Sequence, residues 1–303
     1  MRVFFYAMIT GLSLAFSAQS ELLHKIPFQF QDGLIWVKVQ LAGTKEPLNY
    51  LLDSGASVTA IDLQTAQACS IRLGDPKSVE GVSGSSAAFD VNDFQATVGG
   101  IPLPKSVVAI DLSAISNRCH RHIDGILGLD FFRDRILQID FETGTIGILK
   151  NCDRSLANCD ILPIKIRNNA ICLPVRIAGR SDQWMRLDTG CDSALEWAGT
   201  ETKTRGTAEP SFDAGADARY INTSVQLGRH CFSNVSVGVR ANQIFPGEDG
   251  LLGNGLLSKF CVTIDERNRR VIFERVHGNR TITHNDPPGS RSYKRPVHCR
   301  PFC

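Results

Sequence analysis

Apolar and polar side chains alternate with a period of two along much of the chain. In residues 33–43, GLIWVKVQLAG, the apolar residues at odd positions from Ile35 onward alternate with Lys38 and Gln40, and residues 172–179 and 220–228 show weaker alternation. Successive side chains of a strand point to opposite faces, so this pattern predicts half-buried strands. Gly, Asn, Asp and Pro interrupt these runs at short intervals, and long stretches of helical period are missing. The pattern predicts an all-β protein.

Four sequence elements occur twice, and the second set keeps the order of the first. Chance matches would not preserve this order, so we infer a duplicated domain, whereas a solenoid needs several short repeats. The expected architecture is therefore two homologous lobes, each a six-stranded, β-barrel-like sheet. The matched elements are residues 51–57 with 185–193, 97–103 with 226–232, 123–132 with 248–257, and 136–149 with 260–273.

The N-terminus has the pattern of an export signal. Arg2 precedes an apolar stretch over residues 3–16, and Ala18 and Ser20 have the spacing of a cleavage site. A membrane anchor is the alternative, but the stretch is short for a span of about 20 residues and contains polar positions. The predicted divisions are 1–20 signal peptide, 21–149 N-terminal lobe, 150–160 connector, 161–276 C-terminal lobe, and 277–303 polar and basic tail.

Charge and cysteine content narrow the cellular setting. The formal net charge of +2 gives no reason to expect nucleic acid or an anionic membrane as a partner. All ten cysteines follow the predicted signal, which favours disulfides in the periplasm or outside the cell. Pairing cannot be deduced, although Cys152 with Cys159 and Cys299 with Cys303 could close short loops. The fragment CHRH at residues 119–122 lacks a second half with zinc-ligand spacing, so no metal is predicted.

The strongest motif is an acid-hydroxyl-glycine triplet, present at residues 53–55 and again at 188–190. Each triplet is followed in its own repeat by two apolar residues and a glycine, ending at Gly128 or Gly253. One such triplet is weak evidence, but two copies with their own distal motifs are specific. Together they resemble the aspartic peptidases, the superfamily of pepsin-like and retropepsin-like enzymes, in a single-chain form with one triplet per lobe. The order of elements follows the resemblance from about residue 34 to residue 273.

The chemistry of two paired carboxyl groups agrees with this resemblance. Two carboxyl groups that share one proton can both activate water and protonate a leaving nitrogen, and they titrate as a unit. The resemblance implies Asp53 and Asp188 as the catalytic dyad, in a cleft between the lobes, without a cofactor. The hydroxyls would bond across the lobes, the nearby glycines would bring N–H groups to the acids, and the distal motifs would pack beneath. The supporting residues are Ser54, Gly55, Thr189, Gly190, Gly128 and Gly253.

The family also closes its substrate site with a β-hairpin flap. In the first repeat this hairpin falls on residues 78–91, and its candidate tip is Gly81, Val82, Ser83 and Gly84. The segment contains no Tyr, which pepsin-like enzymes usually carry, so the first lobe looks closer to the retropepsin-like branch. The second-lobe counterpart, residues 205–220, is either a similar hairpin or only a loop.

Other interpretations of the acidic and histidine residues are open. The alternative for the two motif acids is a pair of Asx-type turns that close strands. We interpret Asp124 and Asp249, in the distal motifs, as loop carboxylates that accept backbone hydrogen bonds. His120 and His122 have no G-x-S-x-G nucleophile motif with them, and we interpret them as surface or structural residues.

Cys191 is the main departure from the family, which usually has Ala, Ser or Thr there. Three interpretations compete: one half of a disulfide, a small buried residue filling the same space, and a redox-sensitive thiol beside the dyad. A strained disulfide at Cys191 would pull the second acid loop out of alignment. The choice among the three interpretations therefore affects the predicted activity more than the predicted fold.

Two functional hypotheses follow. The first is an exported aspartic endopeptidase, a monomer that acts on a polypeptide substrate and has no stable membrane span after signal removal. The second is a catalytically inactive aspartic-peptidase-like protein that binds peptides or serves the cell envelope. Both acids keep their following hydroxyl and glycine, which favours the first hypothesis because a binding module has no need of them.

Overall fold

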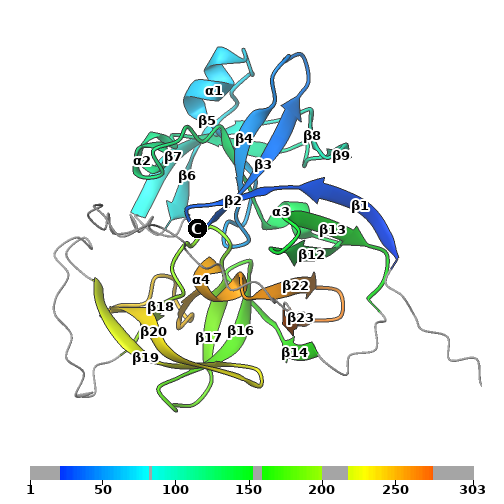
Figure 1. Ribbon diagram of the computed structural model, residues 1–303. Helices are drawn as coiled ribbons and strands as arrows, with labels where there is room; N and C mark the ends of the chain where they lie inside the picture. The colour runs from blue at the N-terminus through cyan, green and yellow to red at the C-terminus, as the bar shows by residue number, and fades with distance from the viewer. Residues whose placement is uncertain (1–20, 82–83, 153–158, 200–217, 276–303) are drawn as a thin grey trace, which may run out of the picture.

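The computed structural model describes residues 21–81, 84–152, 159–199 and 218–275, and within them the protein is built mainly from β-strands arranged in three sheets (Figure 1). This confirms the predicted all-β fold of the acid protease type. In the same residues no helix has the length and hydrophobicity needed to cross a membrane. The predicted signal peptide, the predicted tail with Cys299 and Cys303, and the flap residues Val82 and Ser83 lie outside the described residues.

The first sheet has ten strands and forms the first lobe, at the top of Figure 1. Its order is β6-β7-β10-β5-β11-β4-β3-β8-β9, and β2 pairs with β3. Parallel pairs, β4 with β11 and β5 with β10, lie at its centre. The strands are β2 (Gln29–Gln31), β3 (Leu34–Leu41), β4 (Leu48–Leu52), β5 (Ala60–Asp62), β6 (Pro76–Gly81), β7 (Gly84–Val91), β8 (Ala96–Val98), β9 (Ile101–Pro102), β10 (Val107–Ile110) and β11 (Gly125–Leu127).

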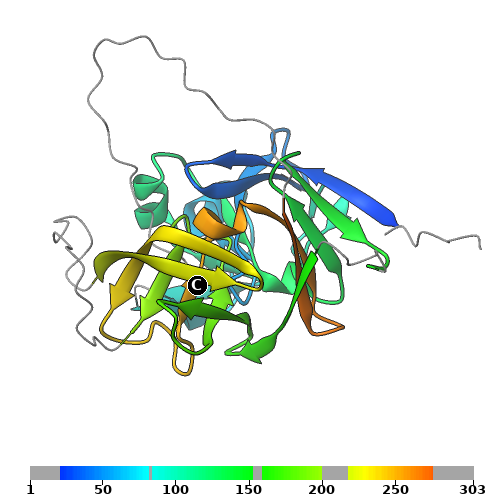
Figure 2. The same ribbon diagram turned by 60° about the horizontal axis from the view of Figure 1, so that its bottom comes forward.

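The second sheet has seven strands and forms the second lobe, at the bottom of Figure 1. Its order is β15-β16-β17-β21-β18-β20-β19, and β19 also pairs with β16, so that six strands close into a ring. Figure 2 shows the long antiparallel pair β19 and β20 in yellow. The strands are β15 (Lys165–Arg167), β16 (Ala170–Ile177), β17 (Gln183–Leu187), β18 (Leu195–Ala198), β19 (Ala218–Leu227), β20 (His230–Arg240) and β21 (Gly250–Leu252).

The third sheet joins the two halves of the chain, at the right of Figure 1. Its order is β1-β13-β12-β22-β23-β14, with three strands from each half. At its centre β12 runs antiparallel to β22, where Gln138 lies opposite Thr263 and donates a hydrogen bond of 3.2 Å to its hydroxyl. The strands are β1 (Leu22–Pro27), β12 (Ile136–Asp140), β13 (Thr145–Leu149), β14 (Cys159–Pro163), β22 (Phe260–Asp265) and β23 (Arg270–Arg275).

Strand registers confirm that the sequence repeat is a structural repeat. In the first lobe Leu52 of β4 lies opposite Leu127 of β11, and in the second lobe Leu187 of β17 lies opposite Leu252 of β21. The hairpins that follow are also equivalent, since the residues aligned by sequence occupy the same register positions. These positions are Ile139 opposite Ile146 in the first hairpin and Ile264 opposite Val271 in the second.

Four short helices within the described residues connect strands of the sheets. The side chain of Asp62 caps α1 by accepting a 3.0 Å hydrogen bond from the N–H of Thr65. Both α3 and α4 directly follow the apolar-apolar-glycine motifs and begin after Gly128 and Gly253. The helices are α1 (Leu63–Ala68), α2 (Ser113–Arg118), α3 (Leu129–Phe132) and α4 (Asn254–Leu257).

Two details differ from the pattern in the sequence. Strand β3 was expected to be half-buried, but Leu34 and Trp36 are buried as well, because its second face packs into an apolar cluster that includes Ile115 of α2. Strand β14 begins at Cys159, inside the predicted connector of residues 150–160, because it pairs with β23 to complete the third sheet.

Candidate active site

The two motif acids lie at equivalent strand ends. Asp53 follows the last residue of β4, and its N–H donates a hydrogen bond of 3.0 Å to the carbonyl of Leu127. Asp188 follows the last residue of β17, and its N–H donates to the carbonyl of Leu252 at the same distance. The parallel pairing of each strand with its distal motif therefore fixes both acids in the same way.

The structure brings these two acids together where the lobes meet. Both side chains are buried, with exposed fractions of 1% for Asp53 and 0% for Asp188. A Cβ atom added at Gly190, beside Asp188, would lie 2.5 Å from Cγ and 2.6 Å from Oδ2 of Asp53. Only glycine leaves room at this position for the carboxyl group of the opposite lobe.

Backbone N–H groups hold one oxygen of each acid. Oδ1 of Asp53 accepts hydrogen bonds from the N–H groups of Gly55, at 2.8 Å, and Ala56, at 3.1 Å. Oδ1 of Asp188 accepts one from Gly190 at 2.9 Å. These bonds orient both carboxyl groups and favour their ionised forms.

Reciprocal hydrogen bonds lock the two acid loops to each other. The hydroxyl of Ser54 donates to the carbonyl of Leu187 at 2.8 Å and accepts from the N–H of Thr189 at 3.1 Å. The hydroxyl of Thr189 donates to the carbonyl of Leu52 at 2.9 Å and accepts from the N–H of Ser54 at 2.9 Å. The cross-lobe bonds expected of these hydroxyls are present, and their symmetry makes the two loops one rigid unit.

Proximity changes the acidity of the pair. Burial raises the pKa of Asp53 well above its usual value, and the negative charge of Asp188 raises it further. The N–H groups of Gly55 and Ala56 act in the opposite direction, and a hydrogen bond with the side chain of Asp188 again raises it. A buried carboxyl pair of this kind holds a proton that one isolated carboxylate would lose.

The distal glycines allow close packing beneath the acid loops. A Cβ atom at Gly128 would lie 2.5 Å from the backbone of Val58, and one at Gly253 would lie 2.6 Å from the carbonyl oxygen of Cys191. Both values are too short for any side chain. The glycines are therefore required by the contact between each distal motif and the acid loop of its own lobe.

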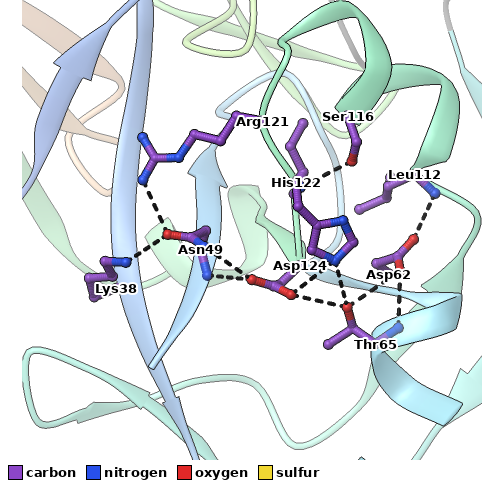
Figure 3. A network of polar contacts seen from close by, with 10 residues as sticks. Lys38, Asn49, Asp62, Thr65, Leu112, Ser116, Arg121, His122 and Asp124 are labelled. Atoms are coloured by element: carbon purple, nitrogen blue, oxygen red, sulfur yellow. Dashed lines mark hydrogen bonds and ion pairs between the residues drawn. The ribbon is translucent and has the colours of Figure 1, made fainter. Parts of the chain in front are cut away.

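Asp124 and Asp249 accept backbone hydrogen bonds, as expected. Oδ2 of Asp124 accepts from the N–H of Asn49, and Oδ2 of Asp249 accepts from the N–H of Trp184, each at 2.7 Å. Figure 3 shows that Asp124 belongs to a polar network that also includes Thr65 of α1. Each acid ties its distal motif to the strand that carries an acid loop.

The histidines of the CHRH fragment lie at the surface. His120 is exposed, and Nε2 of the exposed His122 lies 3.3 Å from the hydroxyl of Thr65 and 3.2 Å from Oδ1 of Asp124 (Figure 3). Across the described ranges, no three His, Cys, Asp or Glu side chains are grouped closely enough to bind a metal ion.

Cys191 is a small, fully buried residue with a free thiol. Its Sγ lies 3.1 Å from the hydroxyl of Ser193. Burial and the charge of Asp188 raise the pKa of the thiol well above its usual value, so it is not a reactive thiolate. The structure supports the second of the three interpretations, a small buried residue, over the first, one half of a disulfide.

Other disulfide expectations have a mixed outcome. Cys69, Cys172 and Cys231 also carry free thiols, although the export pattern predicted pairing. The pairing of Cys152 with Cys159 stays a prediction, since the residues between them lie outside the described part.

The predicted flap is a β-hairpin formed by β6 and β7. The two strands pair from Pro76 opposite Phe89 to Gly81 opposite Gly84. Residues 205–217 of the predicted second-lobe counterpart lie outside the described part, and its last three residues, 218–220, begin strand β19.

A comparison with known families agrees with this geometry. Residues 37–131 match the family model described as aspartyl protease. The match contains the first acid loop, the flap hairpin and the first distal motif. The match supports an assignment to the aspartic peptidase superfamily on the residues of the first lobe. The equivalent acid loop and distal motif of the second lobe come from the structural repeat rather than from this match.

Three polar residues near the two motif acids were not singled out from the sequence. Arg186 replaces the Leu51 of the first repeat, and it forms a buried ion pair with Glu248. Asn254 follows the second distal motif, and its side chain donates to the carbonyl oxygens of Thr189, at 2.7 Å, and Gly33, at 2.8 Å. The sequence does carry a signal for these three residues. At each of these positions the second copy of the repeat has a polar residue where the first copy has an apolar one.

Proposed function

We propose that this protein is an exported, single-chain aspartic endopeptidase in which Asp53 and Asp188 share one proton and activate water. The observation that carries the proposal is the buried carboxyl pair, one acid from each lobe, on loops joined by reciprocal hydrogen bonds. A peptide-binding module would gain nothing from burying two acids side by side, since their desolvation is costly. The family match supports aspartic protease activity.

The proposed reaction uses one ionised and one protonated carboxyl group. The ionised group takes a proton from water as the water oxygen attacks the peptide carbonyl carbon, and the protonated group donates its hydrogen to the carbonyl oxygen. Collapse of the tetrahedral intermediate breaks the C–N bond and transfers a proton to the leaving nitrogen. The second proton returns to the carboxyl pair, so that the starting state is restored.

Substrate class and location follow from the rest of the chain. An extended polypeptide would bind beneath the β6–β7 hairpin, which favours cleavage within a chain over removal of terminal residues. The N-terminal pattern of Arg2, the apolar residues 3–16 and the cleavage spacing supports export to the periplasm or the outside of the cell. We expect a monomer, because one chain supplies both acids.

The test is hydrolysis of a denatured protein substrate from acidic to neutral pH by the wild type, Asp53→Asn and Asp188→Asn. We expect cleavage by the wild type and a loss of at least about a hundredfold in either variant, as removal of a general acid or base predicts. A statine-type inhibitor should block the wild type. Asp182→Asn, which changes an exposed acid paired with Arg176, is the matched control and should keep full activity.

Two outcomes contradict the proposal. If either dyad variant keeps wild-type activity while folded, the assignment of that acid is wrong. If the folded wild type cleaves nothing and binds peptides with an affinity that neither substitution changes, the protein is an inactive peptide-binding relative.

A further inference from the structure

Arg186 is a fully buried cation in the middle of the active-site region. It lies on β17, two residues before Asp188, and only 2% of its surface is exposed. The equivalent residue of the first lobe is Leu51, since Arg186 lies opposite Leu251 of β21 as Leu51 lies opposite Ile126 of β11. A charged side chain has therefore replaced an apolar one on one side of an otherwise repeated site.

Two of the three nitrogens of this guanidinium bond to a carboxylate of its own lobe. Nε and Nη2 of Arg186 donate to the two carboxylate oxygens of Glu248, each at 2.7 Å. Asn168 donates to Oε1 of the same carboxylate at 2.8 Å, and the ring of Phe245 lies 3.6 Å from the guanidinium carbon. This two-point contact fixes the plane of the guanidinium group and neutralises its charge.

The remaining nitrogen reaches across to the other lobe. Nη1 of Arg186 donates a hydrogen bond of 2.8 Å to the carbonyl oxygen of Gly55, in the first acid loop. This carbonyl belongs to the peptide group whose N–H, on Ala56, donates to Oδ1 of Asp53. A charge-assisted bond to the carbonyl side of an amide strengthens donation from its N–H side, because hydrogen bonds in a chain polarise one another.

We propose that Arg186 is a positioning residue that acts on Asp53 from the opposite lobe, by fixing and polarising the peptide group between Gly55 and Ala56. Arg186 thereby favours the ionised form of Asp53 and makes the two acids of a repeated site inequivalent. Leu51 cannot provide the same bond to the second acid loop. The inference rests on the proposed function, because it assigns a role within the same dyad.

The surroundings are consistent with this role. The N–H of Ala56 is one of two donors that lower the pKa of Asp53 against burial and the charge of Asp188. The thiol of Cys172, opposite Arg186 on β16, has its pKa raised to about 12 and stays neutral. The titratable groups around the two acid loops, Arg186 and Cys172 include Asp188, Cys191, Asp192, Glu196, Asp130, Arg167, Glu248 and Asp249.

The test compares substitutions at two Arg–carboxylate ion pairs. In Arg186→Met/Glu248→Gln the guanidinium is lost without leaving a buried, unpaired carboxylate. The control is Arg270→Met/Asp265→Asn, which removes another Arg–carboxylate pair, joined at 2.9 Å in the third sheet and without contact to the acid loops. Arg186→Lys keeps a cation and tests whether a point charge partly restores the effect.

Activity and carboxyl titration are both measured for each protein. We expect the acidic limb of kcat/KM in Arg186→Met/Glu248→Gln to move up by about one pH unit, with kcat/KM about tenfold lower on that limb. Arg186→Lys should lie between this variant and the wild type. The control should keep the wild-type pH profile even if its unfolding temperature falls.

A second readout does not depend on catalysis. Titration of carbon-13-labelled aspartate carboxyls by NMR, with the Asp53 signal assigned from Asp53→Asn, should show a higher midpoint in the Arg186 double variant than in the wild type and the control. An unchanged Asp53 midpoint overturns the inference. If the wild type cleaves nothing, the proposed function fails, and the same titration still decides the role of Arg186.

Discussion

At the scale of single residues, the acid loops show why particular side chains occur at each position. Position 190 requires glycine, because the carboxyl group of Asp53 fills the space that a Cβ would need. Cys191 takes the place that Ala56 has in the first repeat, and its carbonyl accepts from Asn254 as that of Ala56 accepts from Leu129. The role of Cys191 is therefore to fill space in the second acid loop.

We expect Cys191→Ala to keep activity, since the first lobe uses Ala at this position. Loss of one buried sulfur should cost about 1 kcal/mol of unfolding free energy. In the folded wild type, iodoacetamide should modify the exposed Cys231 and leave Cys191 unmodified, as measured by mass spectrometry. Rapid labelling of Cys191 without unfolding, or an inactive but folded Cys191→Ala, would contradict this role.

At the scale of elements, the acid loops depend on the strand pairs beneath them and on each other. Strand β4 pairs in parallel with β11, and β17 pairs in parallel with β21. Each acid therefore follows the end of an equivalent strand pair. The hydroxyls of Ser54 and Thr189 then satisfy backbone groups of the opposite lobe, which no water could reach at their burial. The loops therefore form together or not at all.

We expect Thr189→Val to destabilise the protein and to abolish most activity. Valine keeps the shape but leaves the N–H of Ser54 and the carbonyl of Leu52 without this partner, at about 1–3 kcal/mol for each buried group. Thr189→Ser keeps the hydroxyl and is the control. Denaturant unfolding and kcat measure the effect, and equal stability of the Val and Ser variants would show that these bonds contribute nothing.

At the scale of the whole molecule, two lobes and a shared sheet bring together acids that are 135 residues apart in the chain. The third sheet takes three strands from each half, and its central pair, β12 with β22, joins one strand from each half. The acids are buried where the two lobes meet, so the stability of the fold depends on whether the carboxyl pair holds a proton.

The stability of the wild type should fall with rising pH relative to that of Asp53→Asn. The pKa of Asp53 is raised in the folded protein, so the folded state holds a proton that the unfolded state loses above about pH 4. Stability from this group is complete below that pH and is lost as the pH rises through the folded-state pKa. The loss is about 1.4 kcal/mol for each pH unit that separates the unfolded-state pKa from the folded-state pKa. Denaturant unfolding of both proteins from pH 4 to 8 measures the difference, and parallel stability curves would contradict the raised pKa.

The repeated motifs were enough to predict the all-β class and the duplication, and to single out the two acids, because these depend on local patterns. Alternation of apolar and polar side chains indicates a strand, whichever strand it pairs with. Two copies of a motif in the same order indicate similar local structure around each. The segments 136–149 and 260–273, matched by the repeat, both form hairpins, and their equivalent registers come from the structure.

Long-range packing decided the rest. No local pattern shows that the two hairpins share one sheet, that Cys191 is buried without a disulfide, or that Arg186 of one lobe contacts Gly55 of the other. The residue type alone does not show whether an arginine is buried or exposed. Only the fold brings a carboxylate close enough to neutralise its charge. The sequence by itself determined which residues form the two acid loops, and the tertiary structure decided how each loop acts on the other.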